Sequence, residues 1–137
     1  MKRILMLGLL VFGLCLGTCS VVLAQEITPY SSDLFQKANA TLNVNGKVLT
    51  AQVKIVGRQR LDQVGVSSFA IQEYRNGTWV SVKVFKSGYN KNALTYTHTL
   101  THNGNSGTKY RVRATCVAKL DGQTDTRVRL SSTKTIS

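Results

Sequence analysis

The feature that most constrains the fold is a series of short runs in which apolar and polar residues alternate, each bounded by a turn signal. In the run 47–56, every second position is apolar: Leu49, Ala51, Val53 and Ile55. A period of two places successive side chains on opposite faces of a strand, and no stretch carries a long apolar period of 3.6. The pattern therefore predicts an all-β chain.

Turn signals divide the chain into strands. Asn45-Gly46 and Asn76-Gly77 are typical of two-residue hairpin loops. The expected strands are 40–45, 47–56, 68–74, 78–85, 93–100, 109–119 and 123–131. A crossing loop is expected at 57–67, with Leu61 and Val64 pinning it, and one helical turn is a hypothesis for 32–38. Seven short strands at this spacing favour a single antiparallel β-sandwich.

The hairpin around Asn76-Gly77 can be assigned a register. A two-residue loop pairs Tyr74 with Trp79, Gln72 with Ser81 and Ala70 with Lys83, and it turns Trp79 outward beside Tyr74. The opposite face then forms the core with Phe69, Ile71, Val80, Val82 and Val84.

The last hairpin, around 120–122, is assigned a three-residue loop with Gly122 in a left-handed bulge. A two-residue loop would instead place Val128 and Leu130 on the face of Arg113. The three-residue register separates apolar from charged residues, because it groups Val128 and Leu130 with Val112, Ala114 and Cys116.

The first residues predict export. Lys2 and Arg3 precede an uncharged run, 4–23, and Ala24 gives a small residue before Gln25. This pattern is typical of a cleaved signal peptide at 1–24; an uncleaved membrane anchor is the alternative. We expect an N-terminal extension at 25–38, a sandwich domain at 39–137, and a secreted protein that is extracellular or associated with the cell wall.

The net charge of the chain bears on the classes of molecule that it could bind. The formal charge is +12, and loss of Lys2 and Arg3 with the signal peptide leaves sixteen basic against six acidic residues, or +10. Such a charge favours anionic surroundings such as wall polymers, lipid headgroups or nucleic acid, and does not choose among them. Nucleic acid is not expected, because no nucleic-acid motif appears, and the membrane is expected to be contacted only through the signal peptide before cleavage.

The cysteines exclude an intrachain disulfide in the mature chain. Cys15 and Cys19 leave with the signal peptide, so Cys116 is alone. Cys116 alternates in phase with apolar neighbours, and we expect a buried, unreactive thiol.

Residues 67–131 resemble fibronectin type III and related immunoglobulin-like domains. The resemblance rests on Asn76-Gly77-Thr78-Trp79 before a valine strand, and on the stretch 107–114, in which Tyr110 would form the tyrosine corner. The stretch 100–110 is longer than usual and lacks the usual proline. Position 112, where antibody domains keep a cysteine, is Val112, which excludes a disulfide-bonded immunoglobulin domain.

The whole chain also resembles small secreted proteins of Gram-positive bacteria that, as a group, have no assigned function. The segments 61–68 and 122–127 carry this resemblance. It implies secretion and a sandwich, and it supplies no activity and no catalytic residues.

Groups for catalysis are sparse. His98 and His102 have no nearby cysteine or carboxylate to complete a metal site. A nucleophile pair of Cys116 and His98 would point into the core, and the six carboxylates are scattered. We expect no enzyme, no metal and no cofactor.

The predicted registers bring basic and aromatic side chains to one outward face. The candidate binding residues are Tyr74, Trp79, Lys83, Arg111, Arg113, Arg127 and Arg129, with Arg113 opposite Arg129. Guanidinium groups bind phosphate or carboxylate, and aromatic rings stack on sugars. The alternative is a purely structural ladder of arginines lying on aromatic rings.

These residues favour a secreted, non-catalytic module that binds an anionic cell-surface polymer or glycan. The alternative is a secreted protein–protein interaction module or inhibitor. A third hypothesis is a structural subunit that pairs by adding a strand at a sheet edge.

Overall fold

Seven strands make up residues 33–137, the part of the chain that the structure, a computed structural model, describes. They are β1 (Phe35–Asn45), β2 (Val48–Arg75), β3 (Thr78–Phe85), β4 (Gly88–Asn103), β5 (Lys109–Leu120), β6 (Gln123–Leu130) and β7 (Lys134–Thr135). The predicted signal peptide, with Cys15 and Cys19, lies outside the described residues.

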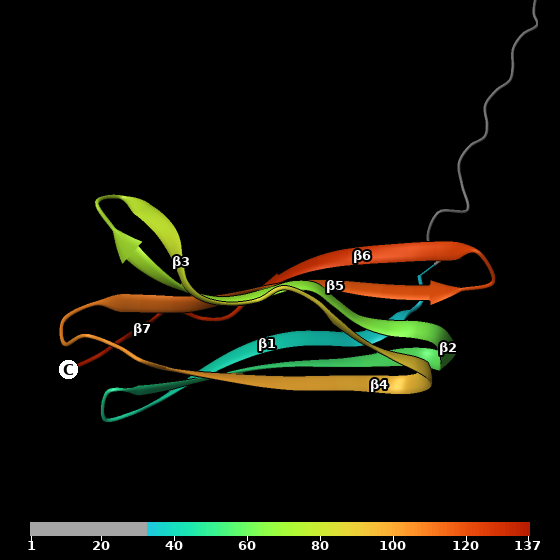
Figure 1. Cartoon of the computed structure of the whole chain (residues 1–137), viewed down its shortest axis with the longest axis horizontal. Coiled ribbons are helices and arrows are strands. Elements are labelled where there is room, and N and C mark those ends of the chain that lie inside the picture. The colour runs from blue at the N-terminus through green and yellow to red at the C-terminus, as the bar shows by residue number, and fades with distance from the viewer. Residues whose placement is uncertain (1–32) are drawn as a thin grey trace, which may run out of the picture. The chain divides into compact units, whose positions relative to one another are not determined.

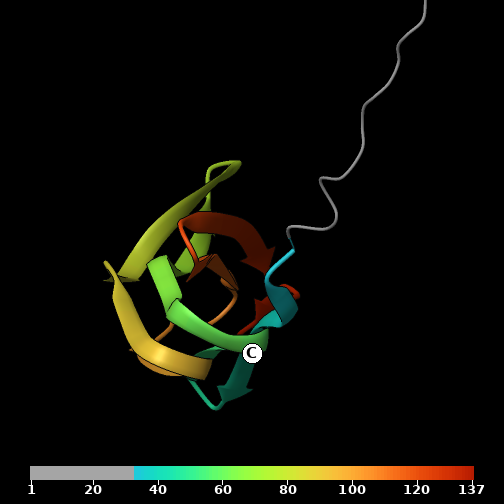
Figure 2. The same cartoon turned by 90° about the vertical axis from the view of Figure 1, so that its right-hand side faces the viewer.

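The long strand β2 organises a single sheet. Its first half pairs with β1 and β4, and its second half pairs with β5 and β3. β6 and β7 both pair with β5, and every pairing is antiparallel. The sheet curls strongly into a half-barrel around its core (Figures 1 and 2). The all-β, antiparallel prediction is confirmed, but the seven strands belong to one sheet and not to two separate sheets.

The expected crossing loop at 57–67 is wrong, because these residues continue β2. The strand bends there while it exchanges partners, with register shifts between Val56 and Leu61 against β4 and between Val66 and Ser68 against β5. Pairing with β4 and β5 from Leu61 onward satisfies backbone groups that a loop would have left to water. Leu61 and Val64 are buried as predicted.

The core confirms the alternation on which the prediction rested. Leu49, Ala51, Val53 and Ile55 are all fully buried. The hypothesis of a helical turn at 32–38 is wrong, since β1 begins at Phe35, whose ring is buried in the core. The helical turn was suggested by Asp33 and Gln36, which are spaced as in a helix capping box. Burial of the Phe35 side chain against β2 outweighs this local preference. The other large, fully buried side chains are Tyr110, Phe69, Leu61, Ile71, Ile136, Val64, Val66 and Val112.

The hairpin of β2 and β3 has the predicted two-residue loop. Asn76 and Gly77 have φ values of 52° and 81°, and Tyr74 pairs with Trp79 and Gln72 with Ser81. A bulge beyond Gln72 then shifts the register, so that Ala70 pairs with Val84 and not with Lys83. Val84 is consequently 54% exposed instead of buried.

The three-residue loop assigned to the last hairpin is wrong. Leu120 pairs with Gln123, and Asp121 and Gly122 form a two-residue loop with φ values of 50° and 81°. This register places Val128 and Leu130 on the solvent face, where they are 45% and 51% exposed.

Tyr110, near the start of β5, takes part in a hydrogen-bond network at the edge of the core. Its buried hydroxyl accepts a hydrogen bond from the backbone N–H of Asn105 at 2.9 Å and donates one to Oε1 of Glu73 at 3.0 Å. Arg75 donates from Nε to the other oxygen of Glu73 at 2.9 Å. This network satisfies a buried carboxylate at the edge of the core.

Candidate functional site

Four of the seven predicted binding residues share the outer face of β2, β3 and β5. Tyr74 pairs with Trp79 across β2 and β3, and their rings lie 5.1 Å apart. Gln72 pairs with Arg111, and Ala70 with Arg113, across β2 and β5. Because side chains at alternate positions share a face, Tyr74, Trp79, Arg111 and Arg113 form one surface.

Arg111 is held over the indole ring of Trp79. Its Cζ lies 4.3 Å from the ring centroid, and its Nε donates a hydrogen bond of 2.9 Å to Oε1 of Gln72. The half-buried guanidinium is thus fixed by one cation–π contact and one hydrogen bond. Its other N–H groups form no hydrogen bond with described residues and can bind a ligand.

Lys109 belongs to this surface and was not predicted. Its Nζ lies 5.6 Å from the centroid of the Tyr74 ring, and Tyr74 itself is 42% exposed. The sequence signal was present, because Lys109 lies in phase with Arg111 and Arg113 along β5. We call Tyr74, Trp79, Lys109, Arg111 and Arg113 the aromatic–basic face.

The charges of the aromatic–basic face are not neutralised within residues 33–137. No described carboxylate forms an ion pair with Lys109, Arg111 or Arg113. Partial desolvation, and secondarily the charge of Arg113, lower the pKa of Arg111 from its usual value. The face therefore carries positive charge that an anion would stabilise.

Arg127 and Arg129 do not join this face. In the two-residue register, Cys116 pairs with Arg127 and Ala114 with Arg129, so both arginines lie on the core side of β6. Arg113 pairs with Leu130, and the predicted opposition of Arg113 and Arg129 is wrong.

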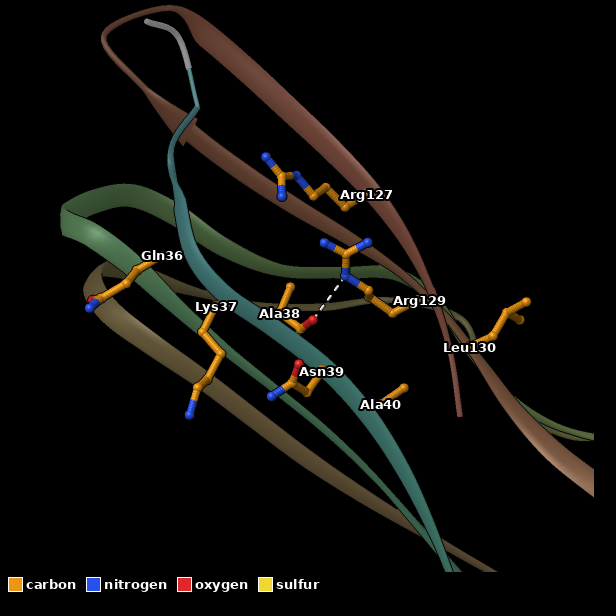
Figure 3. A pocket seen from close by; sticks show the side chains of 8 residues that line it. All are labelled: Gln36, Lys37, Ala38, Asn39, Ala40, Arg127, Arg129 and Leu130. Carbon is orange, nitrogen blue, oxygen red and sulfur yellow. Dashed lines mark hydrogen bonds between the residues drawn. The ribbon is translucent and has the colours of Figure 1, made fainter. Parts of the chain in front are cut away.

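Both arginines extend toward β1, over a groove of about 390 Å³ (Figure 3). Nε of Arg129 donates a hydrogen bond of 2.9 Å to the backbone oxygen of Ala38. The guanidinium of Arg127 lies 5.4 Å from the ring centroid of Phe35. The sequence did not reveal this groove, because it is formed by strands that are distant in the chain.

Lys83 is also separated from the aromatic–basic face. The bulge in the hairpin places it opposite Ile71, and it lines a hollow of about 380 Å³ together with residues at the start of β2 and the end of β4. These are Val48, Thr101, His102 and Asn103.

The histidines and Cys116 lie apart. His98 stacks on the ring of Phe85 at 4.0 Å and forms no hydrogen bond with Cys116. His102 lies in β4, not in the expected loop. Burial raises the pKa of the fully buried Cys116 thiol to about 11. Among residues 33–137, no three His, Cys, Asp or Glu side chains are grouped as metal ligands would be.

Comparison with known proteins assigns no family. No family model matches the chain, and no curated protein matches it either. A protein from Archaeoglobus fulgidus with a known crystal structure resembles it distantly, at 17% identity and a TM-score of 0.41. The match covers 75% of this chain and 98% of the archaeal one. A likeness at this level carries no argument about function.

Within the described part of the chain, no helix is long and apolar enough to cross a membrane.

Proposed function

We propose that this chain is a secreted, non-catalytic binding module whose aromatic–basic face binds an anionic polymer or glycan at a cell surface. The observation that carries the proposal is Arg111, a partly desolvated cation fixed on Trp79 without a carboxylate partner among the described residues. A cation held in this way is preorganised for an external anion.

The arrangement fits a charged saccharide or wall polymer. Arg111 and Arg113 offer planar donors for carboxylate or phosphate oxygens, and Lys109 adds a third charge. The exposed ring of Tyr74 provides an apolar surface on which a sugar ring packs. The formal charge of +10 expected after removal of the signal peptide attracts such a polymer over a longer range.

The proposal also includes a location outside the cell. The signal-peptide pattern at 1–24 and the resemblance to small secreted Gram-positive proteins support a location outside the cell or at its wall. The scattered acids and the separated histidines support a module without catalysis.

The test compares two double variants with equal loss of charge. Arg111→Gln/Arg113→Gln should lower retention on immobilised polygalacturonate and on a glycerol-phosphate polymer by about tenfold or more, because each lost guanidinium removes a charged hydrogen-bond donor. Lys86→Gln/Lys91→Gln, at exposed positions outside this face, serves as the matched control and should retain most of the binding. Equal losses in both variants would show that net charge alone causes retention, and would contradict the proposal.

A protein–protein interaction module is the second candidate, and a specific observation favours it. Val84, Val128 and Leu130 are exposed large apolar side chains on the same outer surface. Salt separates the two functions: retention of a polyanion falls steeply between low and moderate ionic strength, whereas an apolar protein interface changes little.

A further inference from the structure

β1 and β6 lie side by side at the two ends of the main strand path, and the structure records no backbone pairing between them. Two side chains of β6 bridge the seam instead. Asp125 accepts a hydrogen bond of 2.6 Å from the backbone N–H of Leu34, and Arg129 donates to the oxygen of Ala38. From the first contact to the second, the residue number rises by four on both strands, from Leu34 to Ala38 and from Asp125 to Arg129. The two strands therefore run parallel along the seam (Figure 3).

The backbone groups that face the seam follow from the hairpin registers. Asn45 pairs with Val48 across one two-residue loop, and Leu120 with Gln123 across the other. The residues that close such a loop exchange hydrogen bonds, and alternate residues from there point to the free edge. The free edge of β1 therefore presents Ala38, Ala40 and Leu42. That of β6 presents Thr126, Val128 and Leu130.

The seam opens into the groove of about 390 Å³ described above. Among the described residues, the charged ones that line it are Lys37, Arg127 and Arg129. Asp125 lies further along the seam, where it bonds the backbone of Leu34. The groove thus combines two open strand edges with an excess of positive charge.

We propose that this seam accepts an extended acidic peptide segment as an added strand, antiparallel to both β1 and β6. A strand between two parallel strands can run antiparallel to each, which is the better-paired arrangement. Main-chain hydrogen bonds to a free edge supply affinity, and side chains at every second position supply specificity.

The contacts of Arg129 explain why the segment is acidic. Its Nε donates a hydrogen bond to the backbone oxygen of Ala38. In a sheet, that oxygen would accept a hydrogen bond from the backbone N–H of a neighbouring strand. β1 and β6 approach within 8 Å of each other, so they must separate for a strand to enter, because an inserted strand needs about twice the usual spacing of about 4.8 Å. The N–H of the entering strand then replaces Nε at that oxygen, and the released guanidinium needs a new acceptor. A carboxylate on the entering strand satisfies it, so that no buried donor or acceptor is left without a partner.

The probe is a short, end-capped synthetic peptide of alternating glutamate and valine, added to the intact protein. Two control peptides accompany it: one with lysine in place of glutamate, and one with the same acidic sequence N-methylated at every second residue. The first control reverses the charge, and the second removes backbone donors while keeping the charge. The acidic peptide should bind, and both controls should bind about tenfold more weakly or worse.

Two readouts locate the binding. Arg127→Gln/Arg129→Gln should weaken binding about tenfold, whereas the equally charged control Lys86→Gln/Lys91→Gln, at exposed positions outside both surfaces, should not. In the unmodified protein, the peptide should protect the amide protons of Ala40 and Val128 from exchange, while that of Thr41, which faces β2, should not change.

The proposal is overturned if the N-methylated peptide binds as tightly as its parent, or if the amides of Ala40 and Val128 gain no protection. Either result would mean that the arginines attract the peptide without forming a strand. Since the exchange measurement uses the unmodified protein, loss of folding in the double variant does not affect it. Because a different variant abolishes polymer retention, failure here is distinguishable from failure of the proposed function.

Discussion

Arg129 donates from Nε to the backbone oxygen of Ala38 at 2.9 Å, so a side chain of β6 bonds a backbone edge of β1. Between β6 and β1, the half-barrel is therefore held together by side-chain hydrogen bonds. A closed barrel would have backbone hydrogen bonds between these two strands. Arg127 and Arg129, which were predicted to lie on a solvent face, instead contact β1 and so connect the two ends of the sheet.

Arg129→Gln should lower the free energy of unfolding by about 1 kcal/mol, because the shorter amide cannot reach the oxygen of Ala38. Arg113→Gln is the matched control, since Arg113 is exposed and forms no hydrogen bond with described residues. It should change the free energy by less than about 0.5 kcal/mol. Urea unfolding of both variants checks the prediction, and equal effects would contradict a structural role for Arg129.

Cys116 should not react with a thiol reagent in the native protein at neutral pH and should react fully after denaturation. The thiol is buried, and desolvation raises its pKa from 9.0 to about 11. Rapid labelling of the native protein would argue against this burial.

The same shift has a pH consequence. Because the folded pKa of Cys116 is the higher one, its contribution to stability is present below about pH 9 and is lost as pH rises toward about 11. Other groups titrate in this range, so the measurement is the difference in unfolding free energy between wild type and Cys116→Ala. That difference should shrink between these two pH values.

Glu73 should make folding sensitive to acid. The hydrogen bond from Arg75 is the largest cause that lowers the pKa of this carboxyl below 4.5, and burial opposes it. The folded pKa is the lower one, so the contribution is present above about pH 4.5 and is lost as pH falls through the folded pKa. Glu73→Gln should therefore destabilise the protein by about 1–3 kcal/mol at neutral pH and by much less in acid. Denaturant unfolding at both pH values tests this, and an equal cost at both would be inconsistent with it.

Gly65→Ala should destabilise strongly, because a Cβ at this position would lie 2.0 Å from the backbone oxygen of Gly88. β2 and β4 would have to separate where β2 bends, at a cost of about 1–3 kcal/mol or more. Gly46→Ala is the control: its Cβ meets no atom within 4 Å, and its φ of 63° carries only the strain of a left-handed turn residue, about 1 kcal/mol. Thermal melting of the two variants should rank Gly65→Ala as the less stable.

Local patterns predicted much of the secondary structure because they depend on neighbouring residues alone. The period of two around Val53 gave a correct strand and a correct buried face. Asn76-Gly77 gave a correct loop and the correct pairing of Tyr74 with Trp79. The aromatic half of the candidate face follows from this pair, and Lys109 could have been added from its phase with Arg111.

The sequence by itself determined that the chain is built of antiparallel strands, that one hairpin turns at Asn76-Gly77, and that Cys116 is buried. The first hairpin turns one residue later than predicted, because Asn45 pairs with Val48. Only the tertiary structure decided that β2 continues through 57–67, because exchange of strand partners requires residues distant in the chain. It also decided which face of β6 meets the core. Pattern reasoning assumed that Val128 and Leu130 must be buried, but β6 lies at the end of the sheet, where its core-side positions face β1. There, the guanidinium of Arg127 lies over the ring of Phe35 and that of Arg129 bonds the backbone edge of β1, which a shorter apolar side chain could not do.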